Sequence, residues 1–392
     1  MEQTIQQVFD LLKASLFGYD TPVEIEDWQP VFTEMKDQAV AALPKKWIEA
    51  NLPSAEPWHS YCYFQQGQWI RVMHAQDELI KLLESHNIPS VIIKGSAAAM
   101  YYPHPILRSM GDVDVLVRRS DQDRAASVLE ANGYVLAADK DTVKHHYNYI
   151  KNNISIELHK RLPVIDDKDE RLLSFFEAGI DEREWKTSEG YKFPVLPPVL
   201  NGLVLIFHIN QHLRIALGLR QIIDWMMYVN HLSDVQWVEL RMMLQRVGME
   251  KLALTTTAMC QKYFGLKSCF SGCETIDSTV CDELIAFILE KGNFGTKAGV
   301  NGKVEEFSLS AAKKGGFFRR LQKGGLIKWM AARKYAFLRP FAWIYQSFRI
   351  IRILVKNGVS IKKVRDLYEK GLGQRKLIEA LGLSMDRTIK TE

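Results

Sequence analysis

The sequence predicts an α+β fold in which a small mixed-sheet core is embedded between helical N-terminal and C-terminal regions. Three short runs rich in β-branched residues, at 91–93, 113–117 and 154–158, have the composition of strands. On both sides of them the apolar residues recur at helical spacing. With 392 residues, 47% hydrophobic and 25% charged, the chain has the composition of a globular protein of two or three domains.

Residues 1–86 form the predicted N-terminal helical region, whose clearest helical pattern runs from Trp69 to Ser85. The first 17 residues lack the basic start, apolar middle and cleavage site of a signal peptide. The five cysteines are an odd number without a CxxC pair, which is typical of a reducing compartment. We therefore expect a cytoplasmic protein, with a peripheral position at a membrane as the alternative.

Residues 87–162 form the predicted α/β core, and its second strand carries two acids. Side chains alternate between the two faces of a strand, so Val113, Val115 and Val117 would face a core while Asp112 and Asp114 share the other face. Adjacent carboxylates repel each other, and a hard cation such as Mg²⁺ between them removes the repulsion. Solvated acids on an edge strand are the alternative interpretation.

The strand at 153–159 repeats this alternation and places Glu157 and His159 on its polar face. If the two strands are neighbours, Glu157 adds a third carboxylate, and three carboxylates can hold two metal ions for displacement at phosphorus. A plain exposed acid is the alternative for Glu157. His159 would either orient Glu157 or contact a bound ligand.

A strand-to-helix turn at Lys94, Gly95 and Ser96 is the predicted phosphate site. Small residues there expose backbone N–H groups at the start of a helix, which suits a phosphate. Lys94 and Arg108 would supply positive charge for a triphosphate. The alternatives are that Ser96 only caps the helix and that Lys94 is a surface residue.

These motifs resemble the DNA polymerase β nucleotidyltransferase superfamily and, more closely, the bacterial uncharacterised nucleotidyltransferase family. The likeness covers about residues 70–235 and is carried by Ile93-Lys94-Gly95, Tyr102-Pro103 with Arg108, Gly111 to Asp114, Glu157-Leu158-His159, and a later helical segment with His208, His212 and Ile223-Asp224. It implies a polymerase β-like nucleotidyltransferase core in which Asp112 and Asp114 bind Mg²⁺, Glu157 completes the catalytic site, and Gly95-Ser96 holds the triphosphate. The 15 residues between Ser96 and Asp112 are more than the superfamily usually has.

Residues 163–300 form a predicted helical domain that binds the acceptor. Residues 200–232 suggest a buried helix pair interrupted at Gly218. His208 and His212, four residues apart, share a helix face, and buried, hydrogen-bonded rings are the interpretation that we favour. The resemblance implies the alternative, in which both rings line the acceptor pocket together with His159. An HExxH zinc signature is absent. Arg220 and Asp224, also four apart, suggest a pair on the helix surface.

Residues 301–392 form a basic, aromatic-rich helical tail with 21 Lys and Arg against 7 Asp and Glu. Aromatic and basic side chains alternate over 327–355, a composition that suits the headgroup region of a membrane. The interpretation we favour is that the aromatics pack on the body while the cations stay in solvent. No recognised nucleic-acid motif accompanies the segment, which argues against nucleic acid as its partner.

The expected function is therefore transfer of a nucleoside monophosphate from an NTP to a hydroxyl of a small-molecule or protein acceptor, with release of pyrophosphate. The expected cofactor is Mg²⁺, with Mn²⁺ as an alternative. Two other functions stay open: a non-catalytic protein that senses nucleotides or docks partners, and a membrane-surface enzyme of polysaccharide metabolism.

Overall fold

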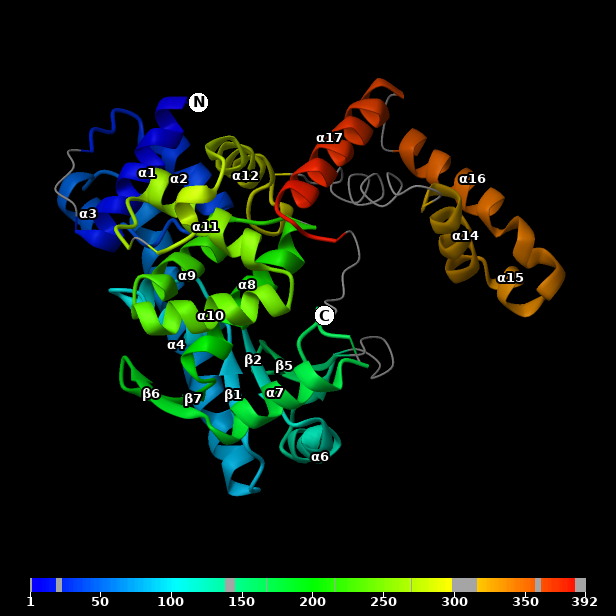
Figure 1. The fold of residues 1–392 in the computed structure, drawn as a ribbon, viewed down its shortest axis with the longest axis horizontal. Coiled ribbons are helices and arrows are strands. Elements are labelled where there is room, and N and C mark those ends of the chain that lie inside the picture. The colour runs from blue at the N-terminus through cyan, green and yellow to red at the C-terminus, as the bar shows by residue number, and fades with distance from the viewer. Residues whose placement is uncertain are drawn as a thin grey trace.

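A mixed seven-stranded sheet and a surrounding set of helices make up this protein in the computed structural model, which describes residues 2–18, 23–137, 145–166, 168–214, 216–268, 270–297, 316–356 and 361–384. Figure 1 shows the sheet in the lower part of the view, the helices α1–α3, α11 and α12 above it, and α14–α16 projecting to one side. The predicted α+β class is confirmed. Cys269 and three parts of the predicted tail, residues 301–315, 357–360 and 385–392, lie outside the described residues.

The sheet has the strand order β3-β4-β5-β2-β1-β7-β6. β2 runs antiparallel to β1 and parallel to β5, so the two predicted acid-bearing strands are neighbours. The strands are β1 (Ser90–Ile93), β2 (Asp112–Val117), β3 (Val135–Leu136), β4 (His146–Lys151), β5 (Ile154–His159), β6 (Glu184–Ser188) and β7 (Tyr191–Val195).

One face of the sheet is covered by two helices, α4 (Glu56–Ser85) and α6 (Gln122–Ala131). The predicted apolar residues of β2 and β5 form a buried cluster with them, which includes Val113, Val115, Ile156 and Leu158. Because side chains alternate along a strand, the acids of β2 and β5 then face the opposite side. The predicted boundary at residue 86 therefore falls between α4 and the sheet, although α4 packs on that sheet.

The sheet continues beyond residue 162, where the sequence predicted a mostly helical region. The hairpin β6–β7 adds two strands, and β7 pairs with β1 at Ile92 and Val195. Glu189 and Gly190 both have positive φ, +48° and +82°, as a tight two-residue hairpin turn requires. Short elements connect the strands: α5 (Gly95–Ala99), η1 (Pro105–Leu107), η2 (Arg119–Asp121) and α7 (Glu170–Asp181).

The other helices form one body, although they come from distant parts of the chain. The N-terminal helices α1–α3 share a single buried core with α8–α12, and Phe9 meets Phe264 edge-to-face at 5.0 Å between ring centroids. The bounds are α1 (Glu2–Phe17), α2 (Trp28–Asp37), α3 (Lys45–Asn51), α8 (Pro198–Leu213), α9 (Leu219–Val229), α10 (Asp234–Arg246), α11 (Glu250–Phe264), η3 (Cys273–Thr275), α12 (Ser278–Lys291) and η4 (Asn293–Gly295). The predicted break at Gly218 is confirmed, since this residue lies just before α9.

The C-terminal part is helical, as predicted, and consists of α14 (Gly316–Lys328), α15 (Met330–Lys334), η5 (Ala336–Phe341), α16 (Ala342–Lys356) and α17 (Ile361–Ala380). α17 returns to the body, where Gln374 donates to the Leu213 carbonyl at the end of α8 at 2.8 Å. The favoured expectation for the aromatics is wrong: Phe337 and Phe348 are 72% and 71% exposed. Among the described helices, none combines the length and apolar character needed to span a bilayer.

Candidate active site

Three carboxylates meet where β2 and β5 run side by side. Parallel pairing sets Asp114 directly opposite Glu157, and Asp112 lies two residues earlier on the same face of β2. All three side chains line one cavity, which has a volume of about 190 Å³. The strand adjacency that the sequence predicted is confirmed, and it follows from the alternation that buries the valines of β2.

The Asp114 carboxylate is held by two hydrogen-bond donors. Lys94 Nζ donates to its Oδ1 atom at 2.7 Å, and His159 Nε2 donates to the same atom at 2.9 Å. Burial raises the pKa of Asp114, but Lys94 and His159 outweigh burial and hold this pKa well below its ordinary value. Asp114 is therefore ionised throughout the neutral pH range, as a metal ligand must be.

Asp112 is in the opposite electrostatic situation. Its carboxyl is open to solvent at the mouth of the cavity, yet protein surrounds it on most sides. Burial, followed by the negative charges of Asp114 and Glu157, raises the pKa of Asp112 to about 6. Three carboxylates thus lie near enough to repel one another, and this repulsion is the electrostatic condition that favours binding of a divalent cation between them.

His159 lies behind the carboxylates rather than at the cavity, where it was expected to face an acceptor. Its side chain has no exposed surface, and its Nε2 atom also lies 3.1 Å from Glu157 Oε2. Burial lowers the pKa of His159, but hydrogen bonds to Asp114 and Glu157 raise it above the ordinary value. The ring therefore orients two acids, which agrees with the other role predicted for it.

A second set of donors overlaps this group. His146, Glu157 and His159 each bring one ligand atom within 4.8 Å of the others. Burial and then the neighbouring His159 lower the pKa of His146, so its ring is neutral near pH 7. For Mg²⁺, however, the oxygen donors of Asp112, Asp114 and Glu157 are the better set, because this cation prefers oxygen ligands.

The turn that joins β1 to α5 also lines the cavity. Lys94 and Gly95 both have positive φ, +57° and +27°, and for Lys94 this is a strained conformation. Ser96 points elsewhere: it is buried and donates to Gln76 Oε1 at 2.6 Å. The side chain of Ser96 therefore fixes α5 against α4, and α5 has no side-chain cap.

The opposite wall of the cavity comes from the helical body. α8 contributes His208 and His212, as the resemblance implied, and their rings meet edge-to-face at 4.5 Å. Burial lowers the pKa of both, to about 4 for His212, so both rings are neutral at pH 7. The lining is completed by Lys94, Gly95, Arg108, Met110, Gly111, Asp112, Asp114, Glu157, Gln211, Arg220 and Phe294.

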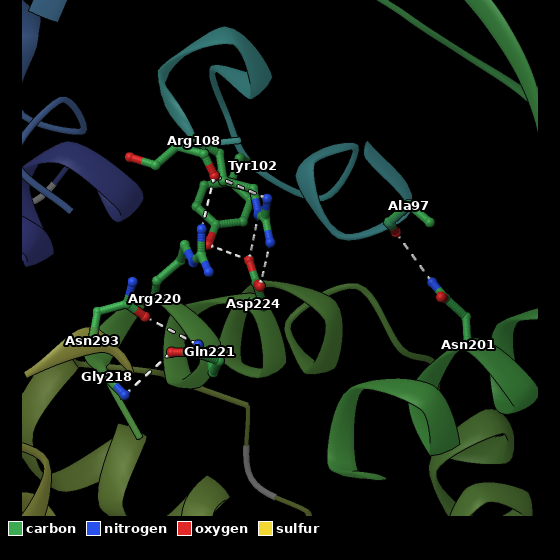
Figure 2. Close-up of polar contacts among 10 residues, drawn as sticks. Ala97, Tyr102, Arg108, Asn201, Gly218, Arg220, Gln221, Asp224 and Asn293 are labelled. Atoms are coloured by element: carbon green, nitrogen blue, oxygen red, sulfur yellow. Dashed lines mark hydrogen bonds and ion pairs between the residues drawn. The ribbon is translucent and has the colours of Figure 1, made fainter. Parts of the chain in front are cut away.

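Arg108 is held by the protein itself. Its Nε and Nη2 atoms donate to the two carboxylate oxygens of Asp224 at 2.7 and 2.6 Å. The Tyr102 hydroxyl donates to the same carboxylate at 2.7 Å. Figure 2 shows Tyr102 and Arg108 converging on Asp224 from above. This buried group joins the segment before β2 to α9, so the expectation of an Arg220–Asp224 pair on the helix surface is wrong.

Arg220 lines the cavity, a position that the sequence did not predict for it. Its guanidinium lies over the Phe294 ring at 5.3 Å and makes one long hydrogen bond, at 3.4 Å, to the Ser109 carbonyl. Among the described residues, Arg220 Nε has no hydrogen-bond partner. The sequence feature that could have indicated this role was an arginine one turn before an aspartate in a mostly apolar helix.

The comparison with protein families agrees with this geometry. Residues 26–265, more than half of the chain, match the family described as Uncharacterised nucleotidyltransferase. The chain belongs to this family. The matched range includes the β2 and β5 acids, the 94–96 turn, and the helices α8 and α9 that close the cavity. The predicted uncharacterised nucleotidyltransferase family is thereby confirmed, while its bacterial origin and its place in the polymerase β superfamily stay predictions.

Comparisons with individual proteins add less. One solved structure, an antigenic nucleotidyltransferase-like protein from Paracoccidioides brasiliensis, is similar at 16% identity with a TM-score of 0.30. The match covers 50% of this chain and 96% of the other. No curated protein matches the chain.

Proposed function

We propose that this protein is a Mg²⁺-dependent nucleotidyltransferase that moves a nucleoside monophosphate from an NTP to a hydroxyl group of a small-molecule or protein acceptor. A new bond forms between the acceptor oxygen and the α-phosphorus, the bond from that phosphorus to the bridging oxygen breaks, and pyrophosphate leaves. The observation that carries the proposal is the convergence of Asp112, Asp114 and Glu157 on one cavity in a chain of this family.

Two of the three acids have one proposed role each, and Glu157 has two alternative roles. Asp112 and Asp114 would hold Mg²⁺, with Glu157 as a further ligand; Mn²⁺ has similar ligand preferences. The bound cation would offset negative charge on the phosphates. Glu157 lies beside both, and it would accept the proton of the acceptor hydroxyl if it does not bind a second ion. The hydrogen bond from His159 keeps Glu157 in place.

Positive charge for the triphosphate comes from a different arginine than the sequence indicated. Arg108 is engaged by Asp224, whereas Arg220 lines the same cavity without an acid within ion-pair distance among the described residues. We assign phosphate binding to Arg220, together with the Lys94 ammonium and the backbone N–H groups near Gly95. The neutral rings of His208 and His212 and the exposed ring of Phe294 would contact the acceptor.

The test uses ATP and GTP labelled at the α-phosphate, with Mg²⁺, and measures labelled product and released pyrophosphate. Asp112→Asn and Asp114→Asn should abolish both signals, while Arg220→Gln should raise KM for the NTP. Glu239→Gln, at an exposed position on α10, is the matched control and should leave turnover unchanged.

Two results would count against this proposal. If Mg-NTP raises the melting temperature of the unmodified protein but no pyrophosphate forms with any acceptor that is tested, the nucleotide-sensing alternative is favoured. If nucleotide binding is equal in unmodified protein, Asp112→Asn and Asp114→Asn, these acids do not hold the metal. A melting curve of each variant in the absence of nucleotide separates loss of chemistry from loss of folding.

A further inference from the structure

The helical arm, defined here as α14, α15, η5 and α16 (residues 316–356), has an unusual charge distribution. Its 41 positions hold ten Lys and Arg and no Asp or Glu, while residues 1–300 have nine more acidic than basic residues. Attraction between such an arm and the body would draw it in, yet Figure 1 shows the arm projecting away from the helices and the sheet. This net positive charge suits an anionic surface outside the molecule.

The arm is folded on itself, and this packing uses only part of its apolar residues. Gly325 of α14 lies so close to α16 that an added Cβ would be 1.9 Å from the Ala342 carbonyl oxygen. Trp329 stacks on Tyr345 at 5.2 Å with nearly parallel rings, and Leu321 is 3% exposed. The helices therefore form a compact hairpin with a small core of its own.

Several other apolar side chains of the arm are exposed. Met330 is 79% exposed, Phe337 72% and Phe348 71%. They are accompanied by Phe318, Ile327, Phe341 and Ile351, which are also exposed. Exposed apolar groups of this number are costly unless another surface covers them. Their combination with a continuous excess of cations is the composition of segments that lie in the headgroup region of a bilayer.

We propose that the arm docks on an anionic lipid surface, with its aromatic and aliphatic side chains in the headgroup region and its cations against lipid phosphates or carboxylates. This inference is independent of the proposed activity. A nucleic acid would also attract the cations, but aliphatic residues such as Ile327, Met330 and Ile351 gain little from stacked bases and gain much from acyl chains. None of the described helices spans a bilayer, so the contact is peripheral.

The experiment measures sedimentation of the full chain with vesicles of neutral phosphatidylcholine, and with vesicles that contain 30% phosphatidylglycerol by design. We expect binding to the anionic vesicles that weakens as salt rises from 0.05 to 0.5 M, because exposed charges are screened. Lys328→Glu with Arg352→Glu should weaken binding roughly 30-fold or more. Phe337→Ser with Phe348→Ser should weaken it roughly tenfold.

Matched controls lie on the body. Lys81→Glu with Lys186→Glu changes the net charge equally, and Val235→Ser with Val238→Ser removes two exposed apolar side chains from α10; both pairs should bind as the unmodified protein does. Equal binding to both vesicle types, absence of binding, or equal losses in test and control pairs would overturn the proposal. Two results in a protein that does not bind vesicles would assign the arm to another partner. Tight binding of a single-stranded oligonucleotide would indicate nucleic acid. A dimer in the absence of vesicles, abolished by Phe337→Ser with Phe348→Ser, would indicate a second copy of this chain.

Discussion

Replacing Asp224 should reveal how much stability the buried group around it provides. Asp224 is 1% exposed and accepts two hydrogen bonds from Arg108, which is 4% exposed, and one from Tyr102. Removing one partner of a buried ion pair costs about 3–5 kcal/mol, a large part of a typical total of about 5–15 kcal/mol. Asp224→Leu and Arg108→Met should each lower the free energy of unfolding by that amount.

The double variant should behave very differently from the sum of the two. With both charges gone, no ion remains buried without a partner, and only the Tyr102 hydroxyl lacks an acceptor, at a cost of about 1–3 kcal/mol. Tyr102→Phe alone keeps the ion pair and should cost a similar amount. We therefore expect a coupling energy of at least about 3 kcal/mol between Arg108 and Asp224.

Urea unfolding followed by circular dichroism and tryptophan fluorescence measures these differences; Trp225 is buried next to Asp224. Additivity of the two single substitutions to within about 0.5 kcal/mol would refute the reasoning, since independent residues add. Because Arg108 lies four residues before Asp112, the same variants should also displace the start of β2, and NTP turnover should fall in the double variant even where stability recovers.

Three further predictions concern single positions. Asp112 has a raised pKa of about 6. Its ionisation therefore destabilises the folded state as the pH rises from the pKa of the unfolded chain through 6. The metal-free Asp112→Asn variant should have a higher melting temperature than the unmodified protein at pH 8 and no such gain at pH 4. His159 has a raised pKa, and its stabilisation is present below the unfolded pKa and lost as the pH rises through the folded value; the melting temperature lost in His159→Phe should therefore be larger at pH 5.5 than at pH 9, and an equal loss at both would contradict this. A Cβ at Gly202 would lie 2.3 Å from the Tyr228 hydroxyl, so Gly202→Ala should cost about 1–3 kcal/mol in urea unfolding, whereas Gly67→Ala, at a position with open space, should not.

Local sequence patterns predicted the acid-bearing strands because burial leaves a strong alternating signal. The valines of β2 and the isoleucines of β5 face α4 and α6, so the acids between them had to face the other way. The hairpin β6–β7 was missed for the opposite reason. Its first strand, from Glu184 to Ser188, has only its last residue buried, and its turn lacks the Asn-Gly or Asp-Gly pair that usually marks such hairpins.

Long-range partners could not be predicted from local pattern. The Arg220 and Asp224 spacing suggested a surface pair, because nothing near them shows that Arg108, 116 residues earlier, would take the carboxylate. The same limit applies to the N-terminal helices, which share a core with α8–α12. The close contact of Gly325 with Ala342 could not be predicted either, because it depends on a helix that comes later in the chain.

Because α17 packs on the body, the arm is connected to the body at both of its ends. Before the arm, Lys297 is fixed to the body by its hydrogen bond to the Leu289 carbonyl at 2.7 Å. After the arm, the chain is fixed to the body by Gln374 and by Arg214, which donates to the Ser384 carbonyl at 2.6 Å. The arm is therefore an insertion tethered at both ends. Excising 316–356 and rejoining the chain would leave the lining of the candidate site intact, whereas cutting the chain at 316 would also remove the contact of Gln374 with the end of α8, the helix that carries His208 and His212.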